Sequence, residues 1–151
     1  GRAILSRLDP SPDAPVFAPF TDVGQIPAKT TNAEPFDTPK KLLDAIAARD
    51  FGPYEKKDLG SVPVDFLSDL DITGGNSGSP IMNRRGELVG LAFDGNYEGL
   101  TSDVVFNKAR TRTIVCDIRY VLWLMDAVDG ADTLLTELGV KPVLPSAPIS
   151  H

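Results

Sequence analysis

A serine lies in the middle of the unusually glycine-rich stretch GGNSGSP, residues 74–80, which separates two apolar runs. A serine hydroxyl attacks a carbonyl when a base accepts its proton and hydrogen-bond donors stabilise the oxyanion that forms. Glycines on either side permit backbone angles that bring the N–H groups of Gly75 and Ser77 to one point. The stretch therefore predicts Ser77 as a nucleophile and these two amides as its oxyanion hole. The alternative is a hairpin connection without chemistry.

Strands are expected on both sides of this stretch. The segment SVPVDFL, residues 61–67, alternates apolar and polar side chains, and Pro63 favours a position at the edge of a sheet. After Ser77, the apolar segments SPIMN and ELVGLAF are separated by Arg84-Arg85-Gly86, which predicts a hairpin with a positive φ at the glycine. Two more strands are expected at SDVVF, residues 102–106, and at TIV, residues 113–115.

Helices are expected towards both ends of the chain. The first covers residues 38–52, with Thr38 as its cap, Pro39 at its first position and Gly52 as its terminator. Its apolar stripe consists of Leu42, Leu43, Ile46 and Ala47. A second helical period runs over residues 118–138 and is interrupted at Asp129-Gly130. The pattern predicts a mainly β fold with flanking helices.

Composition narrows the class of protein. The net charge of −6 argues against a nucleic-acid surface, and no apolar run is long enough to cross a bilayer. Cys116 is the only cysteine, so no internal disulfide can form. No cluster of histidine, cysteine and carboxylate has metal-ligand spacing, and no cofactor is expected. The chain begins with Gly1 and not with methionine, so we expect its natural amino terminus to lie upstream.

Several conspicuous residues have ordinary structural interpretations. Tyr120 and Trp123 share the apolar stripe of the last helical segment, which favours core packing over a binding role. Cys116 has apolar neighbours and is expected to be buried. Arg110 and Arg112 are expected to form a solvated connection.

Three motifs, DITGGNSGSP, GLAFDGN and DIRYVLW, together resemble one family. The chain from Phe20 to Leu138 is similar to the bacterial dipeptidyl-peptidases 7 and 11, the forty-sixth family of serine peptidases. The resemblance implies part of a chymotrypsin-like double β-barrel, namely the second barrel and a carboxyl-terminal helix. Residues 37–139 would be the carboxyl-terminal part of the peptidase domain, between a proline-rich irregular segment, 1–36, and a frayed tail, 140–151.

The resemblance also implies how a peptide is bound. The strand containing Phe93 would line the substrate cleft, and Asp94 would hold the free amino group of the peptide, so that dipeptides are released. Gly95 would lie at the pocket for the residue before the scissile bond, where family members that cut after Asp or Glu carry arginine. Glycine there implies a preference for bulky hydrophobic residues. The alternative for Asp94-Gly95 is a simple turn. The family further implies homodimers and a periplasmic location.

The catalytic base is missing from this sequence. The family orders its triad as histidine, aspartate and serine, yet the only histidine is His151, the last residue. Asp69, Asp71 and Asp94 are poor bases for an alcohol near their normal pKa. We therefore expect the histidine and its orienting aspartate in an amino-terminal part of the same protein, and we expect the 151-residue chain alone to be inactive. A trypsin-like endopeptidase fragment and a non-catalytic relative remain the alternatives.

Overall fold

The computed structural model describes residues 18–31, 33–99 and 106–145. Backbone contacts divide the chain into a strand unit, Gly1–Thr21 with Asp65–Asp117, and a helical unit, Asp22–Val64 with Ile118–His151. The strands are β1 Phe20–Asp22, β2 Pro63–Ser68, β3 Pro80–Met82, β4 Leu88–Gly95 and β5 Thr113–Asp117. The helices are α1 Ile26–Lys29, α2 Lys40–Ala48, α3 Ile118–Trp123 and α4 Asp132–Glu137, and a π-helical turn, Leu124–Val128, follows α3. A mainly antiparallel sheet with flanking helices is thereby confirmed.

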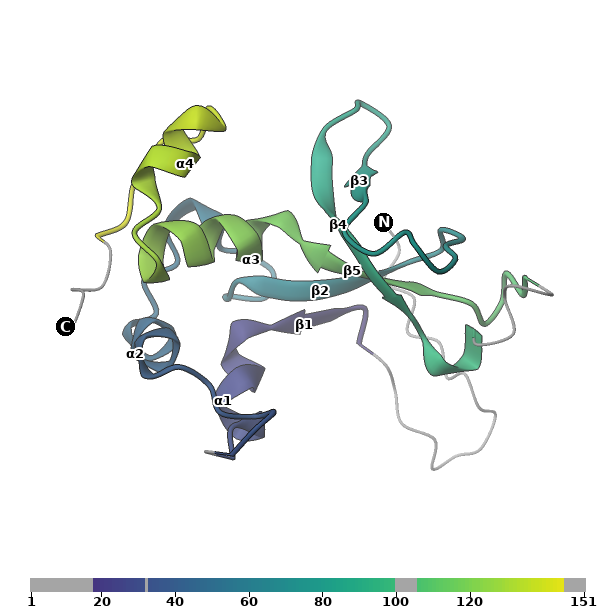
Figure 1. Ribbon diagram of the computed structural model, residues 1–151, viewed down its shortest axis with the longest axis horizontal. Helices are drawn as coiled ribbons and strands as arrows, with labels where there is room; N and C mark the ends of the chain where they lie inside the picture. The colour runs from purple at the N-terminus through teal and green to yellow at the C-terminus, as the bar shows by residue number, and fades with distance from the viewer. Residues whose placement is uncertain (1–17, 32, 100–105, 146–151) are drawn as a thin grey trace. The chain divides into compact units, whose positions relative to one another are not determined.

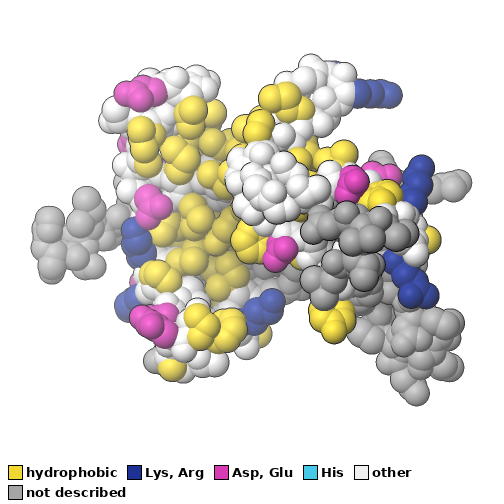
Figure 2. Space-filling model, turned by 45° about the vertical axis from the view of Figure 1, so that its right-hand side comes forward, with side chains coloured by type: hydrophobic (Ala, Val, Ile, Leu, Met, Phe, Trp, Pro, Cys, Tyr) yellow, Lys and Arg dark blue, Asp and Glu magenta, His cyan; other side chains and the backbone are white. Residues whose placement is uncertain are grey.

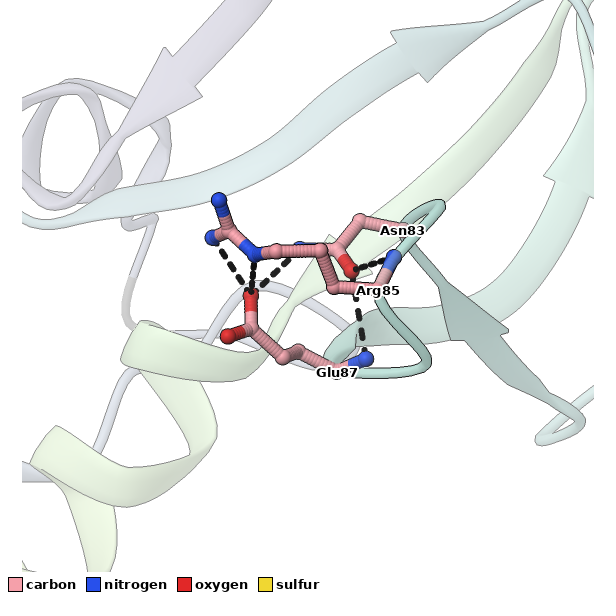
Figure 3. A network of polar contacts seen from close by, with 3 residues as sticks. All are labelled: Asn83, Arg85 and Glu87. Carbon is pink, nitrogen blue, oxygen red and sulfur yellow. Dashed lines mark hydrogen bonds and ion pairs between the residues drawn. The ribbon is translucent and has the colours of Figure 1, made fainter.

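The sheet has the strand order β1-β2-β5-β4-β3 (Figure 1). Its pairs β2–β5, β5–β4 and β4–β3 are all antiparallel. The predicted hairpin joins β3 to β4, and Gly86 has a φ of 77°. Across this turn the side chains of Asn83 and Arg85 donate to the Glu87 carboxylate, and Asn83 Oδ1 accepts the backbone N–H groups of Arg85 and Glu87 (Figure 3). The turn therefore holds the register of β4, the strand that approaches Ser77.

The position of β2 corrects one expectation. Pro63 suggested an edge strand, but β2 lies between β1 and β5. Proline is tolerated because it is the first residue of the strand, and the mapped pairs with β5 begin only at Asp65.

The proline-rich start is also more regular than predicted. Within the segment expected to be irregular, residues 20–29 form β1, a short 3₁₀ turn and α1. Pro27 lies in the first turn of α1, where a helix needs no N–H donor from it, so proline does not oppose the helix. Residues 1–17, and the expected strand 102–106 except for Phe106, lie outside the described residues.

The ends of α2 differ from the expected caps. Thr38 does not cap the helix, because its hydroxyl lies 2.7 Å from that of Thr30 and Pro39 occupies the N-cap position. Arg49, with a φ of 53°, ends the helix before Gly52. In the predicted stripe Ile46 is buried, whereas Ala47 is exposed.

The helical unit has its own apolar core. Trp123 is fully buried, and its ring packs edge-on against Phe51 with a centroid distance of 6.0 Å. Tyr120 stacks on Trp123 at 6.4 Å, as core packing predicts. The remaining buried members are Val23, Ile46, Tyr54, Val62, Ala127 and Val128. Figure 2 shows further hydrophobic side chains gathered on the surface of this unit.

The described part of the tail is anchored and not frayed. Asp126 is fully buried, and its carboxylate accepts hydrogen bonds from the N–H groups of Val143, at 3.1 Å, and Leu144, at 3.3 Å. The Tyr54 hydroxyl donates to the same carboxylate at 2.7 Å. The expectation for residues 140–145 was wrong because the periodicity of the helix did not reveal that Asp126 points inward. Residues 146–151 lie outside the residues that the structure describes.

Candidate active site

The loop between β2 and β3 has a fixed internal geometry. The backbone N–H of Thr73 donates to the Asn76 side chain at 2.9 Å, and the N–H of Asn76 donates back to Thr73 O at 3.2 Å. Gly75 and Gly78 have φ values of 100° and 83°, which lie in the left-handed region where other residues are strained. The two glycines therefore permit this path of the chain around Ser77.

Two backbone hydrogen bonds attach this loop to β4. The N–H of Gly78 donates to Ala92 O at 2.7 Å, and the N–H of Ala92 donates to Ser79 O at 2.8 Å. Ser77 is exposed, and its hydroxyl lies 3.4 Å from Phe93 O. The serine is thus held beside β4 with its oxygen accessible to solvent.

The amides of the loop divide into two groups. The N–H groups of Asn76 and Gly78 are used in backbone hydrogen bonds. Those of Gly75 and Ser77, the two predicted for the oxyanion hole, have no hydrogen-bond partner among the described residues. Backbone N–H groups in folded chains are normally paired or solvated, so these two are open to an incoming oxyanion.

Ser77 lines a hollow of about 180 Å³ in the strand unit. Phe93, Asp94 and Gly95 line the same hollow, so the structure brings together Ser77 and the three residues expected to bind substrate. The other lining residues are Ile72, Thr73, Gly74, Asn96, Gly99, Thr111, Arg112 and Thr113.

An irregularity in β4 shapes one side of the hollow. The pairing with β5 shifts register between Ala92 and Asp94, so Phe93 is an extra residue of a bulge, and it is 61% exposed. Bulges of this kind re-aim side chains and are common beside active sites. Asp94 and Gly95 pair with Ile114 and Thr113 in the strand, so the interpretation of Asp94-Gly95 as a turn was wrong.

Asp94 and Gly95 are both accessible. Oδ1 of Asp94 accepts a hydrogen bond from the N–H of Gly95 at 2.7 Å, whereas Oδ2 has no partner in the described part of the chain. A Cβ added at Gly95 would meet no atom within 4 Å. The site therefore offers one carboxylate oxygen for a cation, and next to it an open space where a side chain would fit.

Asn96 and Arg112 are lining residues that the sequence interpretation missed. Arg112 is only 9% exposed, which corrects its assignment to a solvated connection; Arg110, in contrast, is exposed. A buried arginine in a basic, turn-rich segment gives no periodic signal. Arg112 can be buried because its guanidinium donates hydrogen bonds to three backbone carbonyls of its own loop.

The catalytic base is not identified among the described residues. His151 lies outside them, and Asp69 and Asp71 are exposed and do not line the hollow. The described residues contain no cluster of histidine, cysteine and carboxylate that could hold a metal ion. Cys116 is half-buried and absent from the hollow, and its thiol pKa is raised, first by burial and then by Asp65 and Asp117. A raised pKa disfavours the thiolate that a cysteine nucleophile requires. Among the described helices, none is long and apolar enough to cross a membrane.

Known proteins resemble this chain in sequence. An Asp/Glu-specific dipeptidyl-peptidase of Shewanella putrefaciens is 47% identical over 149 residues, which are 85% of this chain and 20% of that protein. A dipeptidyl-peptidase 7 of Capnocytophaga gingivalis is 54% identical over 105 residues, which are 70% of this chain and 14% of that protein. The chain therefore spans 14–20% of the length of these relatives.

Solved structures and family comparison agree with this similarity. The crystal structure of Porphyromonas endodontalis DPP11 in complex with substrate matches with a TM-score of 0.81 and 34% identity, over 88% of this chain and 19% of that one. The family described as Peptidase S46 matches residues 10–140 of this chain. This match covers most of the sequence, including the loop around Ser77, β4 and the helices that follow β5. The chain belongs to the peptidase S46 family.

Proposed function

We propose that the protein containing this chain is a serine dipeptidyl-peptidase, a hydrolase that removes dipeptides from the free amino end of oligopeptides. The observation that carries the proposal is the exposed Ser77 in a loop whose Gly75 and Ser77 N–H groups have no partner among the described residues. Ser77 would attack the scissile carbonyl and form an acyl-enzyme, and the two amides would stabilise the oxyanion. Water would then release the dipeptide.

Asp94 would set the length of the product. Its Oδ2 is open, and it lines the same hollow as Ser77. A carboxylate binds an ammonium group through strong charge-assisted hydrogen bonds. A peptide whose amino terminus is held by Asp94 would enter only far enough to place its second peptide bond at Ser77.

Gly95 would leave room for a bulky hydrophobic residue before the scissile bond. The relatives include enzymes named Asp/Glu-specific and enzymes named dipeptidyl-peptidase 7, so their names do not decide the preference of this chain. The open space at Gly95 does bear on it, because glycine supplies no cation to pair with a substrate carboxylate. We therefore favour cleavage after Phe, Met or Leu over cleavage after Asp or Glu.

The general base and its orienting carboxylate would come from an amino-terminal part of the longer protein, which would complete the double β-barrel. By resemblance to the family, we further propose a periplasmic location and a homodimer. Peptide substrates, and not nucleic acids or membranes, would be the partners of the site.

Dipeptidyl substrates with free and blocked amino ends test this function in the full-length protein. We expect release of the reporter group only from the free form, and faster release after Phe than after Glu. Cleavage of the blocked form would instead favour a trypsin-like endopeptidase. If the full-length protein cleaves neither form, a non-catalytic role follows.

A further inference from the structure

The loop Asn107–Arg112 forms one wall of the hollow through Thr111 and Arg112. All of its carbonyl groups accept hydrogen bonds. Asn107 O accepts the N–H groups of Arg110 and Thr111, at 2.9 and 2.7 Å. The other carbonyls are bound by two side chains and one further backbone N–H. The loop is therefore internally fixed and not merely a connection.

The Arg112 side chain supplies three of these bonds. Its Nη1 donates to Lys108 O at 3.0 Å and to Thr111 O at 2.7 Å, and its Nη2 lies 3.4 Å from Ala109 O. A guanidinium has five N–H donors in a planar fork, and so can bind several carbonyls at once, which an ammonium group on a flexible stem does less well. The burial of Arg112 is thus explained by its own loop.

Asn96, the residue directly after β4, supplies two more bonds to these carbonyls and accepts one N–H of the loop. Its Nδ2 donates to Arg110 O at 2.9 Å, and its Oδ1 accepts the N–H of Arg112 at 2.7 Å. Its backbone N–H donates to Arg112 O at 2.9 Å. A Cβ added at Gly99 would lie 2.8 Å from the Asn96 Oδ1, so the amide is closely enclosed. Asn96 directly follows Gly95, and it therefore connects the pocket position to the wall.

We propose that Asn96 and Arg112 are positioning residues that hold the loop Asn107–Arg112 as a preformed wall of the substrate pocket. The inference rests on the proposed function, in which the hollow receives the residue before the scissile bond. Within the described residues, the loop around Ser77 is held by hydrogen bonds with β4 at Ala92 and Phe93, and by the Thr113 hydroxyl, which donates to Leu70 O at 2.7 Å. Loosening the wall therefore changes which side chains are accepted while leaving the reactivity of Ser77 intact.

The test uses the full-length protein and two dipeptidyl substrates that differ only in Phe or Ala before the scissile bond. Removing the Asn96 side-chain bonds by Asn96→Ala is expected to raise KM for the Phe substrate about tenfold, because a misplaced wall no longer fits a bulky ring. The kcat of the Phe substrate and both constants of the Ala substrate are expected to change less than about threefold, since a small side chain hardly uses the wall. Arg112→Lys is expected to act in the same direction.

Two controls separate positioning from a general loss of structure. Arg110→Met alters an exposed arginine of the same loop and is expected to leave all constants unchanged. The rate at which a fluorophosphonate labels Ser77 is expected to be the same in wild type and in Asn96→Ala. Asn96→Asp keeps the acceptor for Arg112 and loses the donor to Arg110 O, so it is expected to give a smaller change in the same direction, and it serves if the alanine variant does not fold.

The following results would overturn the proposed positioning role of Asn96 and Arg112. Equal losses on both substrates together with slower labelling would overturn it, because they indicate a structural role alone. A folded Asn96→Asp variant with the wild-type ratio of Phe to Ala cleavage would also overturn it. If the wild-type protein releases no dipeptide at all, the proposed function fails and the inference fails with it.

Discussion

At the scale of single residues, the candidate site depends on atoms that are accessible and have no internal partner. Asp94 offers one open carboxylate oxygen, and Gly75 and Ser77 offer two open N–H groups. Folded chains rarely leave such groups unpaired unless water or a ligand satisfies them. Ser77 and Asp94 line one hollow, so the N–H group of the first and the carboxylate oxygen of the second are available to a ligand there.

Asp94→Asn tests the amino-group anchor. Replacing the carboxylate by a neutral amide keeps the size of the side chain but removes the charge that pairs with the substrate ammonium. In the full-length protein we expect kcat/KM to fall about 10- to 100-fold, mostly through KM, because the lost interaction is a charge-assisted hydrogen bond. Steady-state kinetics measure this split. Asp71→Asn, an exposed aspartate outside the hollow, is the matched control, and a similar fall in that variant would refute a specific role for Asp94.

Gly95→Arg tests the pocket assignment. A Cβ at this position meets no atom within 4 Å, so the backbone should accept a side chain without rearrangement. A guanidinium in the pocket pairs with a substrate carboxylate, and the ratio of cleavage after Glu to cleavage after Phe is expected to rise at least about tenfold. Competition between the two dipeptidyl substrates measures the ratio. An unchanged ratio in a folded variant would place the specificity pocket elsewhere.

At the scale of elements, β4 carries the site because it is held on both sides. It pairs with β5 and with β3, and it also binds the loop around Ser77 at Ala92. Gly90 makes the closest approach: a Cβ there would lie 2.5 Å from Cys116 O and 2.6 Å from a methyl group of Val115. The strand can pack this tightly against β5 only because the residue is glycine.

Gly90→Ala is therefore expected to destabilise the strand unit by about 1–3 kcal/mol, the usual cost of overpacking a core. Gly95→Ala is the control on the same strand, since its added methyl group meets open space. Chemical denaturation of both variants measures the difference. Equal stability of the two would mean that β4 and β5 are less closely packed than the structure shows.

In the helical unit, the buried carboxylate of Asp126 accepts hydrogen bonds from Tyr54 and from the backbone of residues 143–144. Burial, then the hydrogen bond to the Asp126 carboxylate, raises the pKa of the Tyr54 hydroxyl above its usual value of 10.0. Because the folded-state pKa is raised, the stabilisation is fully present below pH 10.0 and is lost only as the pH rises above that value. Tyr54 is therefore a protonated donor at neutral pH.

Asp126→Ala is expected to lower the free energy of unfolding by about 3 kcal/mol, because Tyr54 and two backbone N–H groups lose their acceptor in a buried place. Asp129→Ala removes a neighbouring carboxylate that is 53% exposed and pairs with Lys41, and it is expected to cost less than about 1 kcal/mol. Thermal unfolding compares the two. A similar small effect for both would show that the carboxylate does not anchor residues 143–144.

The sequence predicted some elements well and others poorly, for physical reasons. The hairpin of β3 and β4 and the helices after β5 follow from turn residues and periodicity, which are local properties. The burial of Arg112 and Asp126 depends instead on hydrogen bonds to backbone groups, and no spacing of side chains reveals those. The proline-rich start concealed β1 and α1, because proline at the first turn of a helix is compatible with the helix.

At the scale of the whole molecule, this chain carries the residues proposed as nucleophile, oxyanion site and pocket, while its relatives are roughly five times as long, since 149 matched residues are 20% of one relative and 105 are 14% of the other. The described residues supply no histidine to accept the proton of Ser77. Members of a triad act as a unit, and loss of one member costs on the order of 10⁴- to 10⁶-fold in rate. We therefore propose that catalysis requires the longer protein and is not performed by these 151 residues alone.

Labelling with a fluorophosphonate, followed by mass spectrometry of the modified peptide, tests this central claim most directly. In the full-length protein we expect a single adduct on Ser77, and no adduct there after Ser77→Ala. In the isolated 151-residue chain we expect labelling to be slower by several orders of magnitude, because the proton acceptor is absent. A full-length protein that still releases dipeptides but carries its adduct on another residue would contradict the account.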